Sequence, residues 1–281
     1  MKMVSCKEYV ELKKEQLKEK VSTFETEPVL VVVQVDSNPA SNAYVNGKKC
    51  DAQELGIRCL HIIIDSAKIS QEELEEIIYG FNEDKYVNGI IVQLPIPDKY
   101  NVEKLQNCIS PEKDVDGFRK DSLFKPCTPL GVINYLTYNE YDFVGKTACV
   151  IGRSNIVGKP LAKMLTDLNA TVILCHSKTS NHQLVNLISD SDIIFTCIDK
   201  IEHFKSYEFY SWQDIIDIGL GRGEDGKLHG NIDAASVESL KETNYGSGHF
   251  IISGTGGVGL LTRISLMQNV VEAYEMQNKI I

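Results

Sequence analysis

The segment Val29-Leu30-Val31-Val32-Val33-Gln34-Val35 constrains the fold of this chain more than any other. It is an almost unbroken apolar run, mostly β-branched, and it lacks the alternation of a strand with one face in water. Such a run is typical of a strand in a parallel sheet that helices cover on both faces. The sequence therefore predicts an α/β fold built on a parallel sheet.

Further strand and helix patterns alternate along both halves of the chain. A helix is expected from Pro39 to about Leu55, where Gly56 ends it, and another is expected from Ser70, which opens a capping-box pattern. The other expected elements are strands over 59–64, 89–94, 147–151, 171–175, 192–197 and 214–218 and helices over 5–22, 157–168, 181–189 and 262–277. This alternation indicates parallel α/β units. The length of 281 residues indicates two domains, with the crossing near 126–129.

Composition narrows the class of protein. Lys and Arg number 29 against 39 Asp and Glu, a formal charge of −10, which argues against binding to nucleic acid or an anionic membrane. The N-terminus lacks the apolar core of a secretory signal, and no apolar run approaches the roughly 20 residues of a membrane span. The eight cysteines include no Cys-x-x-Cys pair, so we expect a cytoplasmic protein with free thiols and no metal site.

A glycine-containing turn follows the strand expected at 147–151. Its sequence, Ile151-Gly152-Arg153-Ser154-Asn155-Ile156-Val157-Gly158, opens the next helix, although Ser154 occupies the middle glycine position of the usual dinucleotide fingerprint. The strand at 171–175 ends in His176-Ser177-Lys178, without the acid that holds the ribose of NAD. With Arg153, these donors favour NADP. A plain structural turn and a solvated polar loop are the alternatives.

A lysine on the helix from Pro39 is the candidate for proton transfer. Tyr44 and Lys48 are four residues apart and share a helix face, and the Lys48 stem follows the apolar side of that helix. A lysine beside apolar surface can exchange a proton near neutrality. Gln93 ends a predicted buried strand and can converge on Lys48. Spacing alone, however, favours an ordinary surface lysine.

Two other segments have equally plain interpretations. Lys113-Asp114-Val115-Asp116-Gly117 has the form of an Asp-Gly turn. The glycine cluster Gly254-Thr255-Gly256-Gly257-Val258-Gly259 either lets a ligand approach the backbone or forms a loop before the last helix.

These motifs, in their order along the chain, resemble the bifunctional methylenetetrahydrofolate dehydrogenase/methenyltetrahydrofolate cyclohydrolase family. The resemblance covers essentially the whole chain. The matching segments are Asn38-Pro39-Ala40-Ser41 with Tyr44-Val45-x-x-Lys48, Gly89-Ile90-Ile91-Val92-Gln93-Leu94-Pro95, Pro111 to Gly117, Pro126-Cys127-Thr128-Pro129, Gly152-Arg153-Ser154-x-x-Val157-Gly158-x-Pro160 and Cys175-His176-Ser177-Lys178-Thr179. With the resemblance, the catalytic interpretation of Lys48 replaces the surface one.

The resemblance implies a role for each candidate residue. It makes Lys48 the catalytic residue, lets Tyr44 stack on the pterin, lets Gln93 modulate the lysine and has Asp116 hold the pterin ring. Ser41 and Gly257 complete the implied substrate-binding set. The residues implied to line the NADP site are Gly152, Arg153, Ser154, Ser177 and Ile218.

The resemblance also implies an architecture and a chemistry. Residues 1–128 and 260–281 would form a catalytic folate-binding domain to which the last helix returns, and residues 129–259 a Rossmann-like NADP-binding domain, with a cleft between them. A homodimer through the nucleotide domain is implied. Methylenetetrahydrofolate would lose a hydride to NADP, a step that depends on positioning. Water would then open the methenyl product to 10-formyltetrahydrofolate, with Lys48 moving the protons.

Two segments depart from the family pattern. The usual Pro-rich segment before the last helix is Ser253-Gly254-Thr255-Gly256-Gly257-Val258-Gly259-Leu260 here, without proline, which should loosen it. Asp199-Lys200-Ile201 places a carboxylate where the family usually has glycine. The alternatives are therefore a cyclohydrolase with weakened dehydrogenase activity, a non-catalytic NADP-binding regulatory protein, and an unrelated NADP-dependent Rossmann oxidoreductase.

Overall fold

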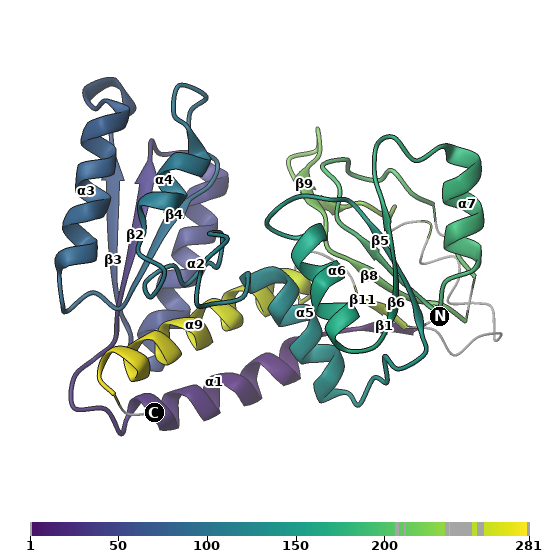
Figure 1. Ribbon diagram of the computed structural model, residues 1–281, viewed down its shortest axis with the longest axis horizontal. Helices are drawn as coiled ribbons and strands as arrows, with labels where there is room; N and C mark the ends of the chain where they lie inside the picture. The colour runs from purple at the N-terminus through teal and green to yellow at the C-terminus, as the bar shows by residue number, and fades with distance from the viewer. Residues whose placement is uncertain are drawn as a thin grey trace. The chain divides into compact units, whose positions relative to one another are not determined.

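The chain divides into two compact units, each built on its own parallel sheet. The computed structural model describes residues 2–205, 208–210, 212–233, 236, 249–251 and 256–279. Glu11–Cys127 and Arg263–Ile281 form the three-stranded unit, and Met1–Val10 and Thr128–Thr262 form the six-stranded unit (Figure 1). The boundary falls inside the first and last long helices, so each of these contributes residues to both units.

The three-stranded unit has the strand order β3-β2-β4, and β2 pairs with both neighbours in parallel. The register places Gln34 of β2 opposite Gln93 of β4. The elements that supply residues to this unit are α1 (Lys7–Val21), β2 (Val29–Val35), α2 (Pro39–Leu55), β3 (Arg58–Ile64), the 3-10 helix η1 (Ser66–Lys68), α3 (Gln71–Glu83), β4 (Gly89–Gln93), α4 (Val102–Cys108) and α9 (Val258–Gln277).

Both faces of this sheet are buried, as the apolar run at 29–35 predicts. Leu30 and Val32 of β2 pack into one cluster with apolar residues of α2 and α9. Val31 and Val33 point the other way and pack with residues of α3 and α4. All seven residues of β2 are therefore buried, and the alternation of side chains along a strand delivers them to two separate cores.

The predicted start and end of α2 and the predicted start of α3 are confirmed. The side chain of Asn38 caps α2 by accepting from the backbone N–H of Ser41, and Gly56 ends the helix at a φ of 76°, the left-handed region that suits glycine. Ser70 and Glu73 form the reciprocal capping box at the start of α3.

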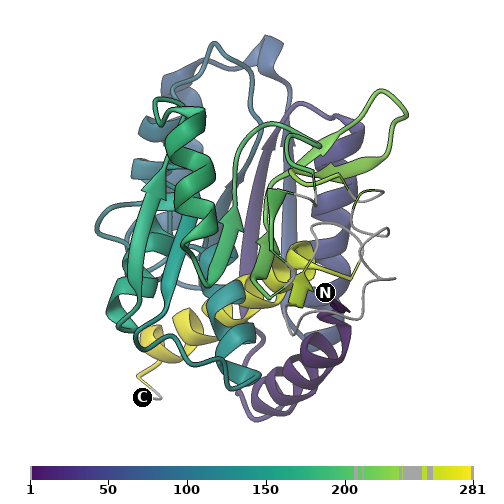
Figure 2. The same ribbon diagram turned by 90° about the vertical axis from the view of Figure 1, so that its right-hand side faces the viewer.

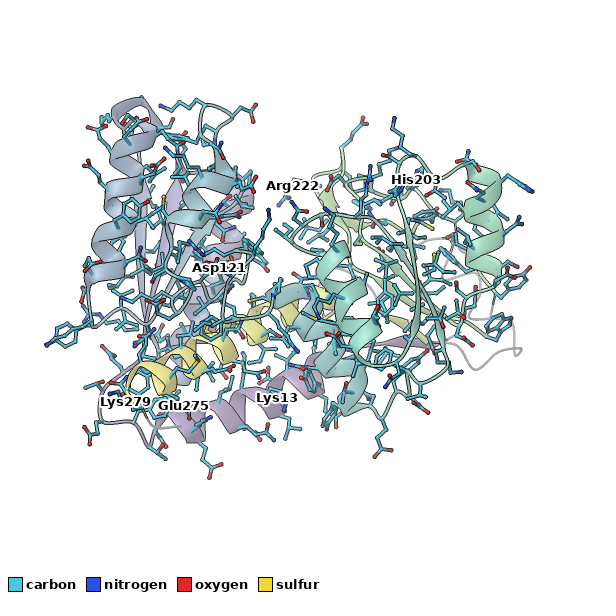
Figure 3. All side chains as sticks on the ribbon, in the orientation of Figure 1. Lys13, Asp121, His203, Arg222, Glu275 and Lys279 are labelled. Atoms are coloured by element: carbon cyan, nitrogen blue, oxygen red, sulfur yellow. The ribbon has the colours of Figure 1, made fainter. Side chains whose placement is uncertain are left out.

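The last helix packs along the first one within this unit. Phe24 stacks on Tyr274 of α9 with 4.4 Å between ring centroids. Lys20 of α1 pairs with Glu275 of α9, labelled in Figure 3, at 2.7 Å from Nζ to Oε2. These contacts fix the end of α9 to α1 and to the loop that follows α1.

The six-stranded unit contains the sheet β1-β11-β8-β7-β5-β6, again with parallel pairings. Figure 2 shows α7 in front of this sheet and the antiparallel hairpin of β9 and β10 at its upper edge. The elements are β1 (Lys2–Val4), α5 (Cys127–Tyr138), β5 (Thr147–Ile151), α6 (Gly158–Asp167), β6 (Thr171–Cys175), α7 (Asn181–Ser189), β7 (Ile193–Thr196), β8 (Asp214–Asp217), β9 (Leu220–Arg222), β10 (Leu228–Gly230) and β11 (His249–Ile251).

The strand order locates the binding edge of this sheet. β6 and β7 flank β5 on opposite sides. After β6 the chain therefore crosses back over β5, and the strand order changes direction between β5 and β7. In open parallel sheets, ligands bind outside the carboxyl ends of the strands at such a switch point. The glycine turn that follows β5 lies at this point.

Both units contain elements that have no clear signal in the sequence. The three-residue strands β1 and β11, the hairpin of β9 and β10, and the helices α4 and α5 are observed without having been predicted, and α9 begins at Val258, a turn earlier than expected. In the described part of the chain, no helix combines the length and the apolar character required to cross a membrane.

The capping box gives a simple stability test. Ser70→Ala removes the hydroxyl that accepts from the Glu73 N–H at 3.2 Å, and this should lower the free energy of unfolding by about 1 kcal/mol. Ser66→Ala is the control, because Asp65 caps that short helix. Urea denaturation measures both, and equal stability of the two variants would contradict the assignment.

Candidate active site

Lys48 lies inside the three-stranded unit and not on its surface. Its side chain is only 3% exposed. Its Nζ donates a hydrogen bond to Oε1 of Gln93 at 3.0 Å and lies 5.0 Å from the centroid of the Tyr44 ring, one helical turn earlier on α2. The structure thus brings Lys48, Gln93 and Tyr44 together, and the surface interpretation that spacing alone favours is excluded.

Gln93 is held so that its oxygen faces the lysine. It is the last residue of β4, and its Nε2 donates to the carbonyl oxygen of Leu94 at 2.6 Å, which leaves Oε1 for Lys48. Among the described residues, no carboxylate lies within ion-pair distance of Lys48. A neutral amide orients an amine without holding its proton as firmly as a carboxylate does.

A second buried amide, missed by the sequence analysis, anchors the helix that carries Lys48. Gln34 is fully buried in β2. Its Nε2 donates to Oδ1 of Asn42 and to the carbonyl of Asp36, both at 2.9 Å, and its Oε1 accepts from Nε2 of His61 at 2.8 Å. Burial and the charge of Lys49 lower the pKa of His61. The sequence contains a signal for a buried polar contact here, because Gln34 is the one polar residue in the apolar run at 29–35.

Asp116 lies in the turn that the sequence predicts and is tied to the same region through Cys127. The N–H of Gly117 bonds to the carbonyl of Asp114 at 2.9 Å, which closes the turn. Cys127 is fully buried; burial and the Asp116 charge raise the pKa of its thiol, while the charge of Lys48 lowers it. Both charged groups therefore act on one thiol. Asn269 of α9 holds this region by donating to the carbonyl of Val115 at 2.8 Å.

Ser41 is buried at the first turn of α2. Its hydroxyl accepts from Nδ2 of Asn38 at 3.0 Å, so Ser41 takes part in the helix cap. Further along α2, Asp51 is buried and pairs with Arg263 of α9, at 2.7 Å from Nε to Oδ2, and with Lys14 of α1 at 3.1 Å. These ion pairs fix α2 against two other helices of its unit.

The glycine turn of the six-stranded unit has no room for side chains. Gly152 has a φ of 129°, which favours glycine, and a Cβ on Gly158 would collide with the carbonyl oxygen of Gly152. The hydroxyl of Ser154 accepts from the N–H of Val157 at 3.2 Å. The turn is thus tight enough to require glycine at both positions, as a dinucleotide-binding turn does, and the Ser154 hydroxyl caps the start of α6.

The end of β6 lies beside this turn. The N–H of Gly152 bonds to the carbonyl of Cys175 at 3.0 Å, which joins the carboxyl ends of β5 and β6. Ser177 and Arg153 are exposed, as is Lys178. No acidic residue stands between the end of β6 and α7. This donor set fits a dinucleotide with a 2′-phosphate.

Ile218 and Gly257 complete the predicted set. Ile218 is buried directly after β8, and its N–H bonds to the carbonyl of Thr196 at 2.8 Å. Gly257 is buried just before α9. Of the glycine-rich segment before it, Ser253, Gly254 and Thr255 lie outside the described residues. Asp199 is exposed in the loop after β7.

The predicted site residues therefore form two sets in two units. Ser41, Tyr44, Lys48, Gln93 and Asp116 belong to the three-stranded unit. The six-stranded unit holds Gly152, Arg153, Ser154, Ser177, Ile218 and Gly257.

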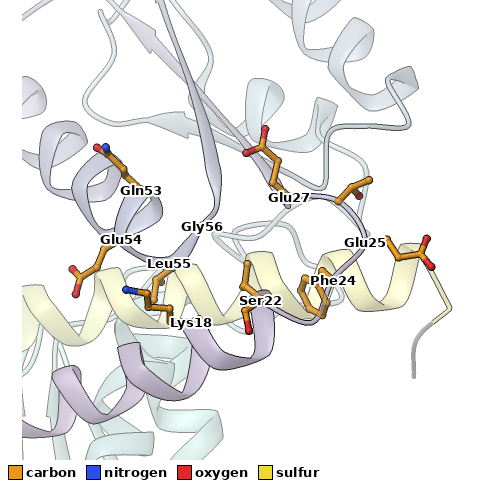
Figure 4. Close-up of a pocket in the computed structure, with 11 residues that line it drawn as sticks. Lys18, Ser22, Phe24, Glu25, Glu27, Gln53, Glu54, Leu55 and Gly56 are labelled. Atoms are coloured by element: carbon orange, nitrogen blue, oxygen red, sulfur yellow. The ribbon is translucent and has the colours of Figure 1, made fainter.

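A separate cavity of about 540 Å³ lies in the three-stranded unit (Figure 4). Its lining comes from the end of α1, the following loop and the end of α2, and includes Phe24, Glu27 and Glu54. None of the predicted site residues lines it, so the candidate active site is defined by the Lys48 contacts and not by this cavity.

One unit holds a buried lysine beside the carboxyl end of a strand, and the other holds a tight glycine turn at the switch point of a parallel sheet. This combination is typical of a two-unit α/β enzyme of the dinucleotide-dependent class. Two family models match the chain: the tetrahydrofolate dehydrogenase/cyclohydrolase catalytic domain over residues 4–116, and the NAD(P)-binding domain of the same family over residues 126–278. The chain belongs to the tetrahydrofolate dehydrogenase/cyclohydrolase family.

Individual relatives agree with this assignment. The chain is 41% identical to the bifunctional protein FolD of Ruminiclostridium cellulolyticum over 260 residues, covering 89% of this chain and 88% of the relative. It is 39% identical to that of Streptococcus agalactiae, covering 97% and 95%. The crystal structure of the bifunctional FolD methylenetetrahydrofolate dehydrogenase/cyclohydrolase of Campylobacter jejuni matches all of both chains with a TM-score of 0.89 and 34% identity.

These matches confirm the resemblance drawn from the motifs and the two-domain α/β fold class. They also confirm an enzyme of the bifunctional dehydrogenase and cyclohydrolase type with a nicotinamide cofactor. They do not favour a regulatory protein or an unrelated oxidoreductase.

A buried carboxyl group beside Ile218 makes stability depend on pH. Burial raises the pKa of Asp217 from 3.8 to about 6. The folded chain therefore keeps a proton that the unfolded chain releases, and stability is lost as the pH rises through about 6. Most of this loss, about 3 kcal/mol in total, falls between pH 3 and pH 7, and about 1 kcal/mol of it falls between pH 5 and pH 8.

Asp217→Asn should remove this part of the pH dependence, while the exposed Asp190→Asn should keep it. Unfolding in urea at pH 5 and pH 8 measures the difference for each protein. An Asp217→Asn profile parallel to that of the wild type would contradict the assigned role of burial.

Proposed function

We propose that the chain oxidises 5,10-methylenetetrahydrofolate with NADP and hydrolyses the 5,10-methenyltetrahydrofolate product to 10-formyltetrahydrofolate. The single observation that carries the proposal is the buried hydrogen bond between Lys48 and Gln93, with the Tyr44 ring beside the same amine. A lysine removed from water and directed by a neutral amide suits proton transfer. Family membership supplies the substrate class.

In the hydrolytic step, Lys48 manages the protons. Water adds to the methenyl carbon between N5 and N10, and the Lys48 amine accepts the proton that this water loses. The bond from that carbon to N5 then breaks, the added oxygen becomes the formyl carbonyl, and its proton passes to N5. Gln93 keeps the Lys48 amine directed along one hydrogen bond through this sequence.

Substrate positioning falls to the residues around the lysine. Tyr44 supplies an aromatic face one helical turn from Lys48, suited to stacking on a flat heterocycle. Asp116 supplies a carboxylate that can accept from the N–H groups of a pterin. Ser41 is the remaining proposed contact from α2, and Gly257 that from the segment before α9.

In the oxidative step, NADP supplies the hydride acceptor when it is bound. The chain's own part is to bind and orient it. Gly152 and Ser154 shape the turn that receives the phosphates, and Ile218 provides apolar lining at the end of β8. Arg153 and Ser177 provide donors for the 2′-phosphate, which favours NADP over NAD.

Further properties complete the proposal. We assign folate binding to residues 1–128 and 260–281 and NADP binding to residues 129–259. We infer a homodimer formed through the nucleotide domain, because β6 is an edge strand of its sheet and exposes Leu174. A cytoplasmic location, with neither nucleic acid nor membrane as partner, is supported by the eight free cysteines and the acidic charge.

A paired assay on the wild-type chain tests the two activities separately. Methylenetetrahydrofolate with NADP should yield methenyl absorbance and NADPH, and NAD should be the poorer cofactor. Methenyltetrahydrofolate without cofactor should lose its absorbance through hydrolysis. Hydrolysis without oxidation would identify a cyclohydrolase with weakened dehydrogenase activity, and absence of both reactions would refute the proposed function.

Replacing the lysine should separate the two reactions. Lys48→Met keeps the length and the apolar stem but cannot carry a proton, so hydrolysis should fall by about 10²- to 10⁴-fold, while oxidation falls far less. Lys49→Met, at the exposed next position, should leave both rates unchanged. Hydrolysis at the wild-type rate in Lys48→Met would show that another group transfers the proton.

A further inference from the structure

The loop after β7 forms one wall of the binding edge in the six-stranded unit. This loop, residues 197–200, leaves the sheet at the switch point between β5 and β7. A Cβ on Gly152 would collide with the carbonyl oxygen of Cys197, so the loop and the glycine turn are in close contact. The position of this loop therefore shapes the protein surface beside the turn.

One buried amide, Asn231, holds this loop. Asn231 is fully buried directly after β10. Its Nδ2 donates to the carbonyl of Ile198 at 2.8 Å and to that of Lys200 at 2.7 Å, and its Oδ1 accepts from the N–H of Ile198 at 3.0 Å. All three bonds go to backbone groups of the loop, so the amide fixes the loop's path whatever its side chains.

The same residue is tied to the end of β8. The backbone N–H of Asn231 donates to Oδ1 of Asp217 at 3.0 Å, and the hydroxyl of Thr196 donates to the same oxygen at 2.8 Å. A Cβ on Gly219 would collide with the Asn231 side chain, so the backbone beside Ile218 packs directly on this amide. Asn231 thus joins the carboxyl ends of β7 and β8.

We propose that Asn231 is a positioning residue for the dinucleotide, because its amide fixes the loop after β7 and the backbone at Ile218 as one rigid wall of the cofactor site. The inference rests on the proposed function. The positioning role requires the two N–H donors of an amide, since both loop carbonyls are acceptors. Aspartate has almost the same shape but no donor when ionised, and it would face those two carbonyl oxygens with a negative charge.

The chain offers a matched control at the amino ends of the strands of the same sheet. Gln213, just before β8, is also fully buried, and its Nε2 donates to the carbonyls of Ile188 at 2.6 Å and Ser191 at 2.7 Å. Gln213→Glu therefore removes the same kind of bonds from the same unit, away from the carboxyl ends of the strands. It reports what loss of a buried amide does to folding alone.

The experiment compares Asn231→Asp, Asn231→Ser and Gln213→Glu in the full chain. For each we would measure the melting temperature, the KM for NADP and the kcat of oxidation, and the rate of methenyltetrahydrofolate hydrolysis without cofactor. Both Asn231 variants should raise the KM for NADP by about tenfold or more and leave hydrolysis within about twofold of wild type. Gln213→Glu should lower the melting temperature without changing the KM. Asn231→Ser is uncharged and serves if Asn231→Asp fails to fold.

The outcomes separate the inference from the function on which it rests. A wild-type KM for NADP in a folded Asn231 variant would overturn the inference, as would an equal rise in KM in Gln213→Glu. A parallel loss of oxidation and hydrolysis in both Asn231 variants would also overturn it, because it would show a merely structural role. Failure of the wild-type chain to oxidise its substrate would instead refute the proposed function.

Discussion

The candidate site depends on burying the amine of Lys48 against a neutral partner. Burying a charged group without a partner costs several kcal/mol, and a carboxylate partner would stabilise the charged form. Gln93 satisfies one donor of the amine through its side-chain oxygen and brings no charge of its own. This hydrogen bond forms only if α2 and β4 keep a fixed position relative to each other. The polar contacts around the site hold that position.

Buried amides fix the ends of strands in both units. Gln34 joins β2 to the start of α2 and to β3 through Asn42 and His61, so the helix that carries Tyr44 and Lys48 cannot slide. Asn231 joins the loop after β7 to the end of β8 in the same way. Amides suit this task because each offers donors and an acceptor without a charge, and their bonds to backbone groups hold a loop independently of its sequence.

Much of this could be predicted from local sequence. The valine run at 29–35 gave a doubly covered parallel strand, and the Ser70 capping box and Gly56 marked helix ends. The i, i+4 spacing of Tyr44 and Lys48 was correct, but it could not show that Lys48 is buried, because burial depends on elements distant in sequence, such as α9, which packs against the apolar residues of α2. The motif resemblance supplied what spacing could not.

The remaining features depend on contacts between distant residues. The β1 and β11 strands are three residues long and pair with each other across most of the chain, so neither has a periodic pattern. Asn231 bonds to a loop some 30 residues earlier, and nothing in its neighbours marks it. Gln34 was visible as a polar residue in an apolar run, yet its partners were not.

The most direct test is a crystal structure of the chain with a folate substrate analogue bound. Nζ of Lys48 should lie within about 3 Å of an oxygen or nitrogen at the reacting carbon, the distance over which a proton can pass, and Tyr44 should lie against the pterin ring. An analogue bound away from Lys48, with the lysine still covered by protein, would contradict the central claim.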